Sequence, residues 1–309
     1  MLKKIVYFTQ FFCYNLFYLW FKCTIIYGDR MYKILYNEKL NDNSYEMAVS
    51  APNVTKKCMP GQFVIVMSKE DSEKIPLTIY DYDRNKEILY LIYQVVGAST
   101  LELSCIKDEL FSVAGPLGNA NEICQDVEKF KNKRIVYVAG GVGIAPVYPQ
   151  VKYLANHNVK VDVIYGARNK DLLLIKDKIE NVANKVFYVT DDGSFGEKGF
   201  VTNVLENIIH NYDICVAIGP VIMMKNVALL TQKYNVKTIV SMNPLMIDGS
   251  GMCGACRCKV DGKTKFACVS GPEFDGHKVD FDLVLKRLET YKDEEKEQME
   301  KMQNLLKKD

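Results

Sequence analysis

The sequence lacks any strong excess of charge of one sign. Its 40 lysine and arginine residues nearly balance 38 aspartate and glutamate residues, which leaves a formal net charge of +2 over 309 residues. It also lacks a dense basic run with interleaved aromatic side chains, the pattern of a nucleic-acid-binding surface. We therefore expect no nucleic-acid partner.

Histidine is scarce, with three residues in the chain. His157 and His210 fall at the ends of predicted helices, where a histidine often complements the helix dipole. His277 follows a cysteine-rich stretch and is equally well explained as a surface residue. No convincing acid–base pair for a substrate pocket is visible, so the chemistry must be sought in other residue types.

Signals for disulfide bonds are missing as well. Six of the ten cysteines are scattered singly, and each is better explained as a buried free thiol than as half of a disulfide. This usage favours a reducing compartment, and we predict a cytoplasmic protein. These six are Cys13, Cys23, Cys58, Cys105, Cys124 and Cys215.

The other four cysteines lie within residues 248–277, among glycines. Plant-type [2Fe–2S] loops read C-x4-C-x2-C followed by a distant cysteine. Cys253 and Cys256 match the middle pair, Cys268 matches the distant ligand, and Asp248 occupies the first position. Because a carboxylate oxygen can ligate iron, the sequence predicts a [2Fe–2S] cluster held by these four residues.

Two alternatives to this ligand set remain open. Cys258 would supply a fourth thiolate, but it lies in a predicted strand over residues 257–260 that turns at Asp261 and Gly262. On such a strand Cys256, Cys258 and Val260 share one face, so Cys258 is expected to pack as a small apolar residue. Structural zinc sites usually have two paired cysteine motifs, and the chain has one.

The chain divides into five regions by pattern. Residues 1–30 are an apolar extension. We interpret them as a dispensable segment that precedes a true first residue at Met31, and the minority alternative is a membrane anchor over residues 5–27. Residues 31–128 contain short β-branched and aromatic runs, which predict an antiparallel barrel. Residues 132–242 alternate apolar strands with helices, which predicts a doubly wound parallel sheet. The cluster segment 243–282 and a single charged C-terminal helix, 283–309, complete a multidomain β plus α/β fold.

Three loops of the α/β region predict a nicotinamide dinucleotide site. Each follows a predicted strand, and open α/β sheets bind ligands at that edge. Glycines in the first loop let a diphosphate approach the backbone at the start of a helix. The candidate residues are Gly140, Gly141, Gly143, Ile144, Ala145, Pro146, Asp191, Asp192, Gly219, Pro220 and Met223.

The barrel region holds a second candidate site. A hydroxyl beside a strand at residues 75–78 would reach the edge of a flavin ring, but an ordinary edge strand explains the same segment equally well. Residues 92–94 and the start of the following helix would hold a diphosphate and stack an aromatic base. The candidate FAD residues are Ile75, Pro76, Leu77, Thr78, Ile92, Tyr93, Gln94, Gly97, Ser99 and Thr100.

The order of these motifs resembles that of ferredoxin reductase-like flavoproteins. From about residue 31 to 282 the chain is similar to the electron-transfer subunit of dihydroorotate dehydrogenase, and more so to the small subunit of NADH-dependent reduced ferredoxin:NADP+ oxidoreductase. The specific matches are Asp248-x4-Cys253-Gly-x-Cys256-Arg and residues 271–277. In the dihydroorotate relatives the first ligand is normally cysteine. One departure is Ile75, where many flavoproteins of this kind have arginine.

The resemblance implies an oxidoreductase subunit with FAD and a [2Fe–2S] cluster that uses NAD(P)H. The flavin would accept a hydride and pass electrons singly to the cluster, while the protein positions the cofactors. The implied partner is a larger flavin and iron–sulfur subunit, with ferredoxin as a further acceptor. The alternatives are a subunit for dihydroorotate oxidation and a zinc-stabilised binding module without redox activity.

Overall fold

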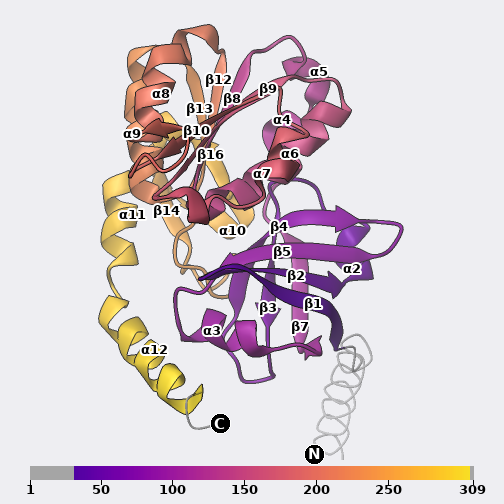
Figure 1. Ribbon diagram of the computed structural model, residues 1–309. Helices are drawn as coiled ribbons and strands as arrows, with labels where there is room; N and C mark the ends of the chain where they lie inside the picture. The colour runs from indigo at the N-terminus through magenta and orange to yellow at the C-terminus, as the bar shows by residue number, and fades with distance from the viewer. Residues whose placement is uncertain (1–30, 307–309) are drawn as a thin grey trace, which may run out of the picture.

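The computed structural model describes residues 31–306, so both readings of residues 1–30 lie outside the described range. Figure 1 shows a β-barrel at one end and an α/β domain at the other, with the C-terminal helices running along the side of both. Within residues 31–306, no helix combines the length and the apolar character needed to cross a bilayer.

The first part is an antiparallel sheet of seven strands that curves into a nearly closed barrel, in the order β6-β1-β2-β5-β4-β3-β7. Alternate residues of each strand fill its interior, as the two-residue period of a strand requires. The elements are β1 (Tyr32–Asn41), β2 (Ser44–Ser50), α2 (Pro52–Thr55), β3 (Phe63–Met67), β4 (Ile75–Asp83), β5 (Ile88–Gln94), α3 (Ala98–Cys105), β6 (Glu109–Leu110) and β7 (Ser112–Leu117).

The second part is the predicted doubly wound sheet, in the order β11-β10-β9-β8-β12-β13-β16, with all pairs parallel except β13 with β16. After the short helices α4 (Glu122–Gln125) and α5 (Val127–Phe130), its elements are β8 (Ile135–Gly140), η1 (Gly141–Gly143), α6 (Ile144–Asn156), β9 (Val161–Ala167), η2 (Lys170–Leu172), α7 (Lys176–Glu180), β10 (Lys185–Thr190), β11 (Glu197–Lys198), α8 (Val201–Ile208), η3 (Ile209–Asn211), β12 (Ile214–Ile218), α9 (Val221–Lys233) and β13 (Lys237–Ser241).

The two faces of the parallel sheet pack into two cores, and the barrel contributes to both. Helices α6 and α7 cover the face of Ile135 and Tyr137, together with Ile92 from the barrel. Helices α8 and α9 cover the opposite face, where Ile65 of the barrel joins Cys256 of the cluster segment. The apolar contact is therefore continuous from the barrel through the sheet to the cluster segment.

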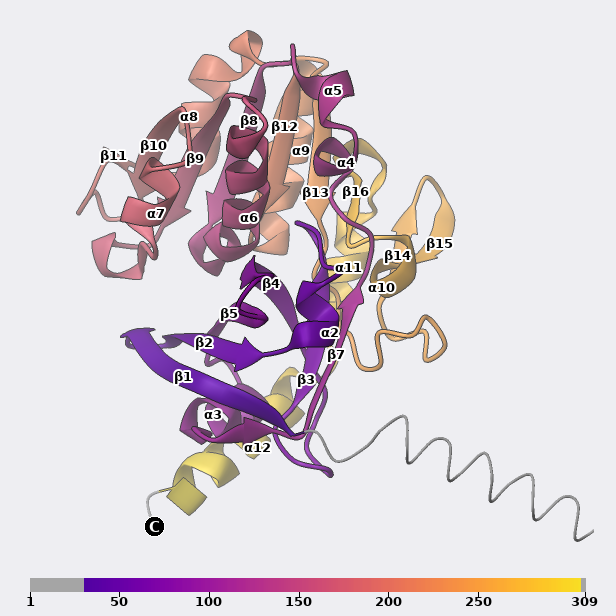
Figure 2. The same cartoon turned by 90° about the vertical axis from the view of Figure 1, so that its right-hand side faces the viewer.

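The cluster segment forms the hairpin β14 (Arg257–Val260) and β15 (Lys263–Phe266), then α10 (Ala267–Ser270), β16 (Glu273–Asp275) and η4 (Gly276–Lys278). The hairpin projects from the side of the molecule, as Figure 2 shows. Strand β16 pairs with β13, so this segment also closes one edge of the nucleotide-domain sheet. No pattern in residues 273–275 predicts that strand.

The prediction of a single C-terminal helix over residues 283–309 is wrong. Residues 281–306 form two helices, α11 (Phe281–Leu288) and α12 (Lys292–Leu306). Phe281 and Val284 bury α11 against the core beside the cluster cysteines, whereas α12 lies against α3 of the barrel. Helix α11 lies against α9 and β14, helix α12 lies against α3, and the chain changes direction between the two helices (Figure 1).

Candidate functional site

The predicted nucleotide loop lies at the carboxyl edge of the parallel sheet and is tightly packed against a second predicted loop. A Cβ atom on Gly140 would lie 2.5 Å from Met223 Sδ and 2.9 Å from Pro220 Cδ. A Cβ atom on Gly143 would lie 2.3 Å from the carbonyl oxygen of Ile218. Glycine is therefore required for the loops after β8 and β12 to approach each other.

Gly141 differs from these two glycines because it faces open space. Its φ of 55° lies in the left-handed region, and no heavy atom lies within 4 Å of a Cβ built on it. Gly141 begins the short helix η1, and the N–H of Ile144, the first residue of α6, donates to the carbonyl oxygen of Gly141. An open glycine at the amino end of a helix fits a diphosphate, the ligand predicted for this loop.

The other predicted nucleotide residues have unequal surroundings. Ile144 and Ala145 are buried at the start of α6, so only their backbone groups can face a ligand. Pro146 is partly buried, and Gly219 lies against Gly140. Asp191 and Asp192 are exposed after β10, two strands away from β8. Hydrogen bonds from Ser194 hold the pKa of Asp192 below its usual value.

The predicted FAD residues on β4 and β5 divide between the two faces of the barrel wall. Pro76 is exposed and Thr78 partly exposed on β4, and Gln94 is partly exposed at the end of β5. Ile92 packs into the core shared with the nucleotide domain. The short helix η1 lies against β5, so this outer face of the barrel meets the nucleotide loop.

Three predicted FAD residues lie inside the barrel instead. Ile75, Leu77 and Tyr93 belong to its buried core. Tyr93 is 2% exposed, stacks on Tyr45 with ring centroids 5.7 Å apart, and donates a hydrogen bond of 2.9 Å to Asn37 Oδ1. The expectation that Tyr93 stacks on an aromatic base is therefore wrong, since its ring is already packed. The side chains of Ile75 and Leu77 are likewise withdrawn from the outer face.

The predicted diphosphate residues at the start of α3 are hydrogen-bonded within the chain. Thr100 Oγ1 accepts from the N–H groups of Val96 at 3.0 Å and Gly97 at 3.1 Å. Ser99 Oγ donates to the carboxylate of Glu73. Gly97 faces open space, with no heavy atom within 4 Å of an added Cβ. The Glu73 carboxylate already lies beside the first turn of α3, where a helix N-terminus favours an anion, so a diphosphate bound there would have to displace it.

Two of the predicted cluster ligands are already paired in the interior. The Sγ atoms of Cys256 and Cys268 lie 3.2 Å apart, and both residues are buried. Burial, together with the hydrogen bond and charge of Cys256, raises the pKa of the Cys268 thiol to about 11. A metal must therefore displace a proton from this thiol, which is the usual coupling between metal binding and deprotonation.

The other two predicted ligands, Asp248 and Cys253, lie on the loop outside this pair. Cys253 is exposed, and Asp248 accepts a hydrogen bond of 2.6 Å from Lys74 Nζ and one of 2.9 Å from Ser250 Oγ. These bonds hold the pKa of Asp248 below its usual value, so it is ionised. Among residues 31–306, no three His, Cys, Asp or Glu side chains converge as a closed metal site.

Cys258 has the surroundings predicted for a packed residue. It is 1% exposed and lies in the apolar core with Val260 and Phe281. Burial raises the pKa of its thiol to about 11, and its Sγ donates weakly to the carbonyl oxygen of Cys256 at 3.8 Å. Its place on the same strand face as Cys256 and Val260 agrees with the strand pattern.

The loop that carries Asp248 and Cys253 fits closely against the barrel. Gly249 has a φ of 69°, and a Cβ atom there would lie 2.6 Å from Ile65 Cδ1 and 2.8 Å from Leu117 Cδ1. Two donors on a glycine-rich loop, Asp248 and Cys253, together with the buried thiol pair Cys256 and Cys268 fit an iron–sulfur cluster. The contact of Asp248 with Lys74 also joins this loop to the residue before β4.

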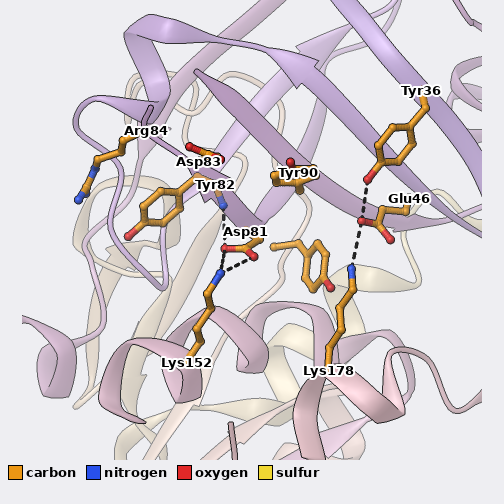
Figure 3. A pocket seen from close by; sticks show the side chains of 10 residues that line it. Tyr36, Glu46, Asp81, Tyr82, Asp83, Arg84, Tyr90, Lys152 and Lys178 are labelled. Atoms are coloured by element: carbon orange, nitrogen blue, oxygen red, sulfur yellow. Dashed lines mark hydrogen bonds and ion pairs between the residues drawn. The ribbon is translucent and has the colours of Figure 1, made fainter. Parts of the chain in front are cut away.

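Sequence reasoning missed a group of charged residues between the barrel and the nucleotide domain. Lys152 of α6 pairs with Asp81 of β4 at 2.7 Å, and Lys178 of α7 pairs with Glu46 of β2 at 3.4 Å. They line a cavity of about 460 Å³, shown in Figure 3. The partners are 71 and 132 residues apart in sequence, so no local pattern could have revealed them.

Glu273 was also missed. Its carboxylate accepts hydrogen bonds from Asn121 Nδ2 at 2.7 Å and Gln150 Nε2 at 2.8 Å. The residue as a whole is partly exposed, but its carboxyl group is buried in the protein interior. Burial raises the pKa of this carboxyl group to about 7, although the two hydrogen bonds act to lower it. Glu273 thereby ties the cluster segment to α4 and α6.

This combination of an antiparallel barrel, a doubly wound nucleotide domain and a cysteine-rich C-terminal segment defines a ferredoxin reductase-like oxidoreductase. Residues 137–228 match the family profile described as the oxidoreductase NAD-binding domain. Residues 243–280 match the iron–sulfur cluster binding domain of dihydroorotate dehydrogenase B.

The chain belongs to the family of dihydroorotate dehydrogenase B electron transfer subunits and their homologues. It is 42% identical over 273 residues to a homologue of that subunit from Thermotoga maritima, covering 87% of this chain and 94% of the relative. It is 47% identical over 272 residues to an uncharacterised protein of Clostridium beijerinckii encoded in the adh 3′ region, covering 86% and 92%.

A solved structure is similar over nearly the whole described chain. It is the NADH-dependent reduced ferredoxin-NADP oxidoreductase, reported for flavin-based electron bifurcation, with 39% identity and a TM-score of 0.81. The match covers 89% of this chain and 98% of that one. These comparisons confirm the predicted fold class and the prediction of an oxidoreductase subunit with nucleotide and iron–sulfur domains.

Proposed function

We propose that the chain passes electrons from NAD(P)H through FAD to a [2Fe–2S] cluster and on to a partner subunit. Hydride acceptance and single-electron transfer are the chemistry that the flavin and cluster supply when bound. The residues of the chain bind and orient these groups. The nucleotide would lie over Gly141 and the start of α6, and the flavin over the outer face of β4 and β5.

One observation carries this proposal. Asp248, the predicted first cluster ligand, is hydrogen-bonded to Lys74, the residue that directly precedes the predicted flavin segment of β4. The end of β5 meets η1 of the nucleotide domain. The three candidate sites are therefore consecutive neighbours in space, in the order nucleotide, flavin and cluster.

The cluster loop is also the surface from which electrons would leave. Apolar side chains are exposed on it and beside it, with Met252 at 89%, Ile247 at 50% and Val269 at 46%. Within this loop, Gly251 packs closely against Val269, because a Cβ atom on Gly251 would lie 2.9 Å from Val269 Cγ1. Exposed apolar residues around Cys253 fit a protein partner that covers the cluster.

The flavin site is tested by placing a side chain at Gly97. The φ of this residue is −153°, and a Cβ there meets no protein atom, so Gly97→Val should fold normally. If a diphosphate lies at the start of α3, the added methyl groups will weaken FAD binding by roughly tenfold or more. Unchanged FAD content in Gly97→Val would place the flavin elsewhere.

We infer that the complex is of the ferredoxin:NADP+ oxidoreductase type, because Asp248 occupies the first ligand position. The second candidate is a subunit for dihydroorotate oxidation, which the similarity to dihydroorotate dehydrogenase B electron transfer subunits favours. Anaerobic co-purification separates the two. A partner with FAD and further iron–sulfur clusters supports the first, whereas an FMN-containing partner that oxidises dihydroorotate supports the second.

A further inference from the structure

We propose that Lys152, Asp81, Tyr80 and Tyr148 form an interdomain clamp that sets how closely the nucleotide loop approaches the flavin strand. These are positioning residues, and none belongs to the predicted nucleotide, FAD or cluster sites. The functional part of this inference rests on the proposed function. The contacts themselves do not, and Figure 3 shows the ion pair of Lys152 with Asp81.

The clamp joins the two elements that carry the candidate redox sites. Strand β4 begins with the predicted flavin residues 75–78, and Asp81 follows three residues later. Helix α6 begins directly after the glycine loop, and Lys152 lies two turns further along. Movement of α6 along β4 would therefore shift the nucleotide loop relative to the flavin face.

A β-bulge directs these side chains. The register between β4 and β5 runs from Ile79 opposite Leu91 to Asp81 opposite Tyr90, which leaves Tyr80 as the extra residue. Ile79 and Tyr80 are consequently both buried in one strand. Bulges commonly re-aim side chains, and this one turns Asp81 towards α6.

The ion pair is well connected on both sides. Lys152 Nζ donates to Asp81 Oδ1 at 2.9 Å and Oδ2 at 2.7 Å. Asp81 Oδ1 also accepts from the backbone N–H of Tyr82 at 2.9 Å, which fixes the carboxylate. The Lys152 and Asp81 side chains are 36% and 21% exposed, so solvent screens the pair only in part.

Aromatic rings extend the contact beyond the ion pair. The ring centroids of Tyr80 and Tyr148 lie 5.2 Å apart, and Tyr148 lies one turn before Lys152 on α6. Lys152 Nζ lies 5.6 Å from the Tyr148 centroid, and Lys178 Nζ lies 5.0 Å from that of Tyr80. The Tyr80 hydroxyl has no hydrogen-bond partner within the described residues. Its ring rather than its hydroxyl therefore makes the contact.

The test compares Lys152→Met with three other variants of the intact, cofactor-loaded protein. Lys152→Met should leave FAD content and NADH dissociation constant within about twofold of wild type. It should lower the rate constant of flavin reduction at saturating NADH by about tenfold, because small misplacements of reacting groups are costly. The charge-exchanged double variant Lys152→Asp with Asp81→Lys should recover most of the lost rate.

Two controls are expected to behave as wild type. Tyr80→Phe removes only the unpartnered hydroxyl, and Arg134→Gln removes an exposed ion pair with Asp213 inside the nucleotide domain. An unchanged rate in Lys152→Met overturns the proposal. So does a double variant as slow as Lys152→Met, or a loss of FAD that accounts for the slower rate.

Hydrogen exchange supplies a readout that does not depend on the redox reaction. In Lys152→Met, amides of residues 144–156 and 75–83 should exchange faster, whereas those of β12 and β13 should not change. Equal exchange in wild type and variant contradicts the clamp. If wild-type flavin is not reduced by NADH but exchange changes as expected, the proposed function fails and the clamp stands.

Discussion

Cys256, Cys258 and Cys268 are all buried, but their neighbours give them different roles. Cys256 and Cys268 face each other across 3.2 Å, whereas Cys258 is surrounded by Val260 and Phe281. Cys258→Ser should therefore keep the iron content of wild type, with only a modest loss of stability. Cys268→Ser should lose the cluster. Iron and sulfide analysis after anaerobic purification measures both, and loss of iron in Cys258→Ser alone would overturn the assignment.

Asp248 is the residue that distinguishes this ligand set from one of four thiolates. Asp248→Cys should retain a [2Fe–2S] cluster, because the new thiolate occupies the same position on the loop. Its reduction potential should shift, since ligand type and hydrogen bonding tune such clusters. A redox titration followed by electron paramagnetic resonance measures the shift. A potential equal to that of wild type would indicate that Asp248 does not ligate iron.

Glu273 gives the stability a predictable pH dependence. Its pKa is raised to about 7, from a usual value near 4.5, so the folded protein retains a proton that the unfolded chain has released. Stability therefore falls as pH rises through this window, by about 3 kcal/mol at most. The Glu273→Gln variant lacks this loss. Between pH 5 and pH 8 its free energy of unfolding should therefore rise relative to that of wild type by about 2 kcal/mol.

Chemical unfolding at the two pH values measures that difference. Gln150 can rotate its amide to accept from the new side chain, because its Oε1 has no partner within the described residues. Glu128→Gln on the exposed surface of α5 is a matched control and should show no such dependence. A pH-independent difference between Glu273→Gln and wild type would contradict the burial of this carboxyl group.

At the scale of elements, α11 packs against the cysteine-containing segment, whereas α12 packs against α3 of the barrel. Arg287 of α11 donates a hydrogen bond of 3.0 Å to the carbonyl oxygen of Ala255, beside the cluster cysteines. Deleting residues 292–309 should therefore leave iron and sulfide content unchanged, because α11 stays in place. Deleting residues 281–309 should abolish the cluster. Iron loss in the shorter deletion would show that α12 also supports the segment.

The elements also show what local sequence can specify. The buried parallel strands were predictable because strands covered on both faces are continuous apolar runs, as in Ile135–Gly140. Strand β16 was not predictable, since three residues carry no period and its partner β13 lies far away in sequence. The break between α11 and α12 depends on tertiary packing, and no glycine or proline marks it.

The candidate site divides in the same way. Motif glycines predict the nucleotide loop and the cysteine spacing predicts the ligand pair Cys256 and Cys268, because both predictions rest on local backbone requirements. Tyr93 was expected to stack on an aromatic base but lies in the barrel interior, because the strand face that meets the interior depends on register with neighbouring strands. Lys152 and Asp81 meet only after the two domains dock, so no local pattern contains them.

At the scale of the molecule, the order of the domains matches the order of the proposed electron path. The nucleotide loop meets the barrel at β5, and the cluster loop meets the residue before β4. Two continuous apolar cores join these parts, which favours a fixed arrangement of the three sites. Removal of the cluster should therefore not prevent reduction of the flavin by NAD(P)H.

That expectation can be checked in Cys268→Ser. The variant should retain FAD, and NADH should bleach its flavin absorbance under anaerobic conditions, because the proposed nucleotide and flavin sites lie on β4, β5 and α6. Parallel loss of FAD and iron in this variant would instead make the three sites one cooperative unit.

The most direct test of the account is an anaerobic NADH titration of the purified wild-type protein, with FAD, iron and sulfide quantified in the same sample. We predict stoichiometric FAD, iron and sulfide in the ratio of a [2Fe–2S] cluster, and full reduction of flavin and cluster by about 1.5 equivalents of NADH, because FAD takes two electrons and the cluster takes one. A protein that contains zinc in place of iron, or that lacks flavin, would contradict the account.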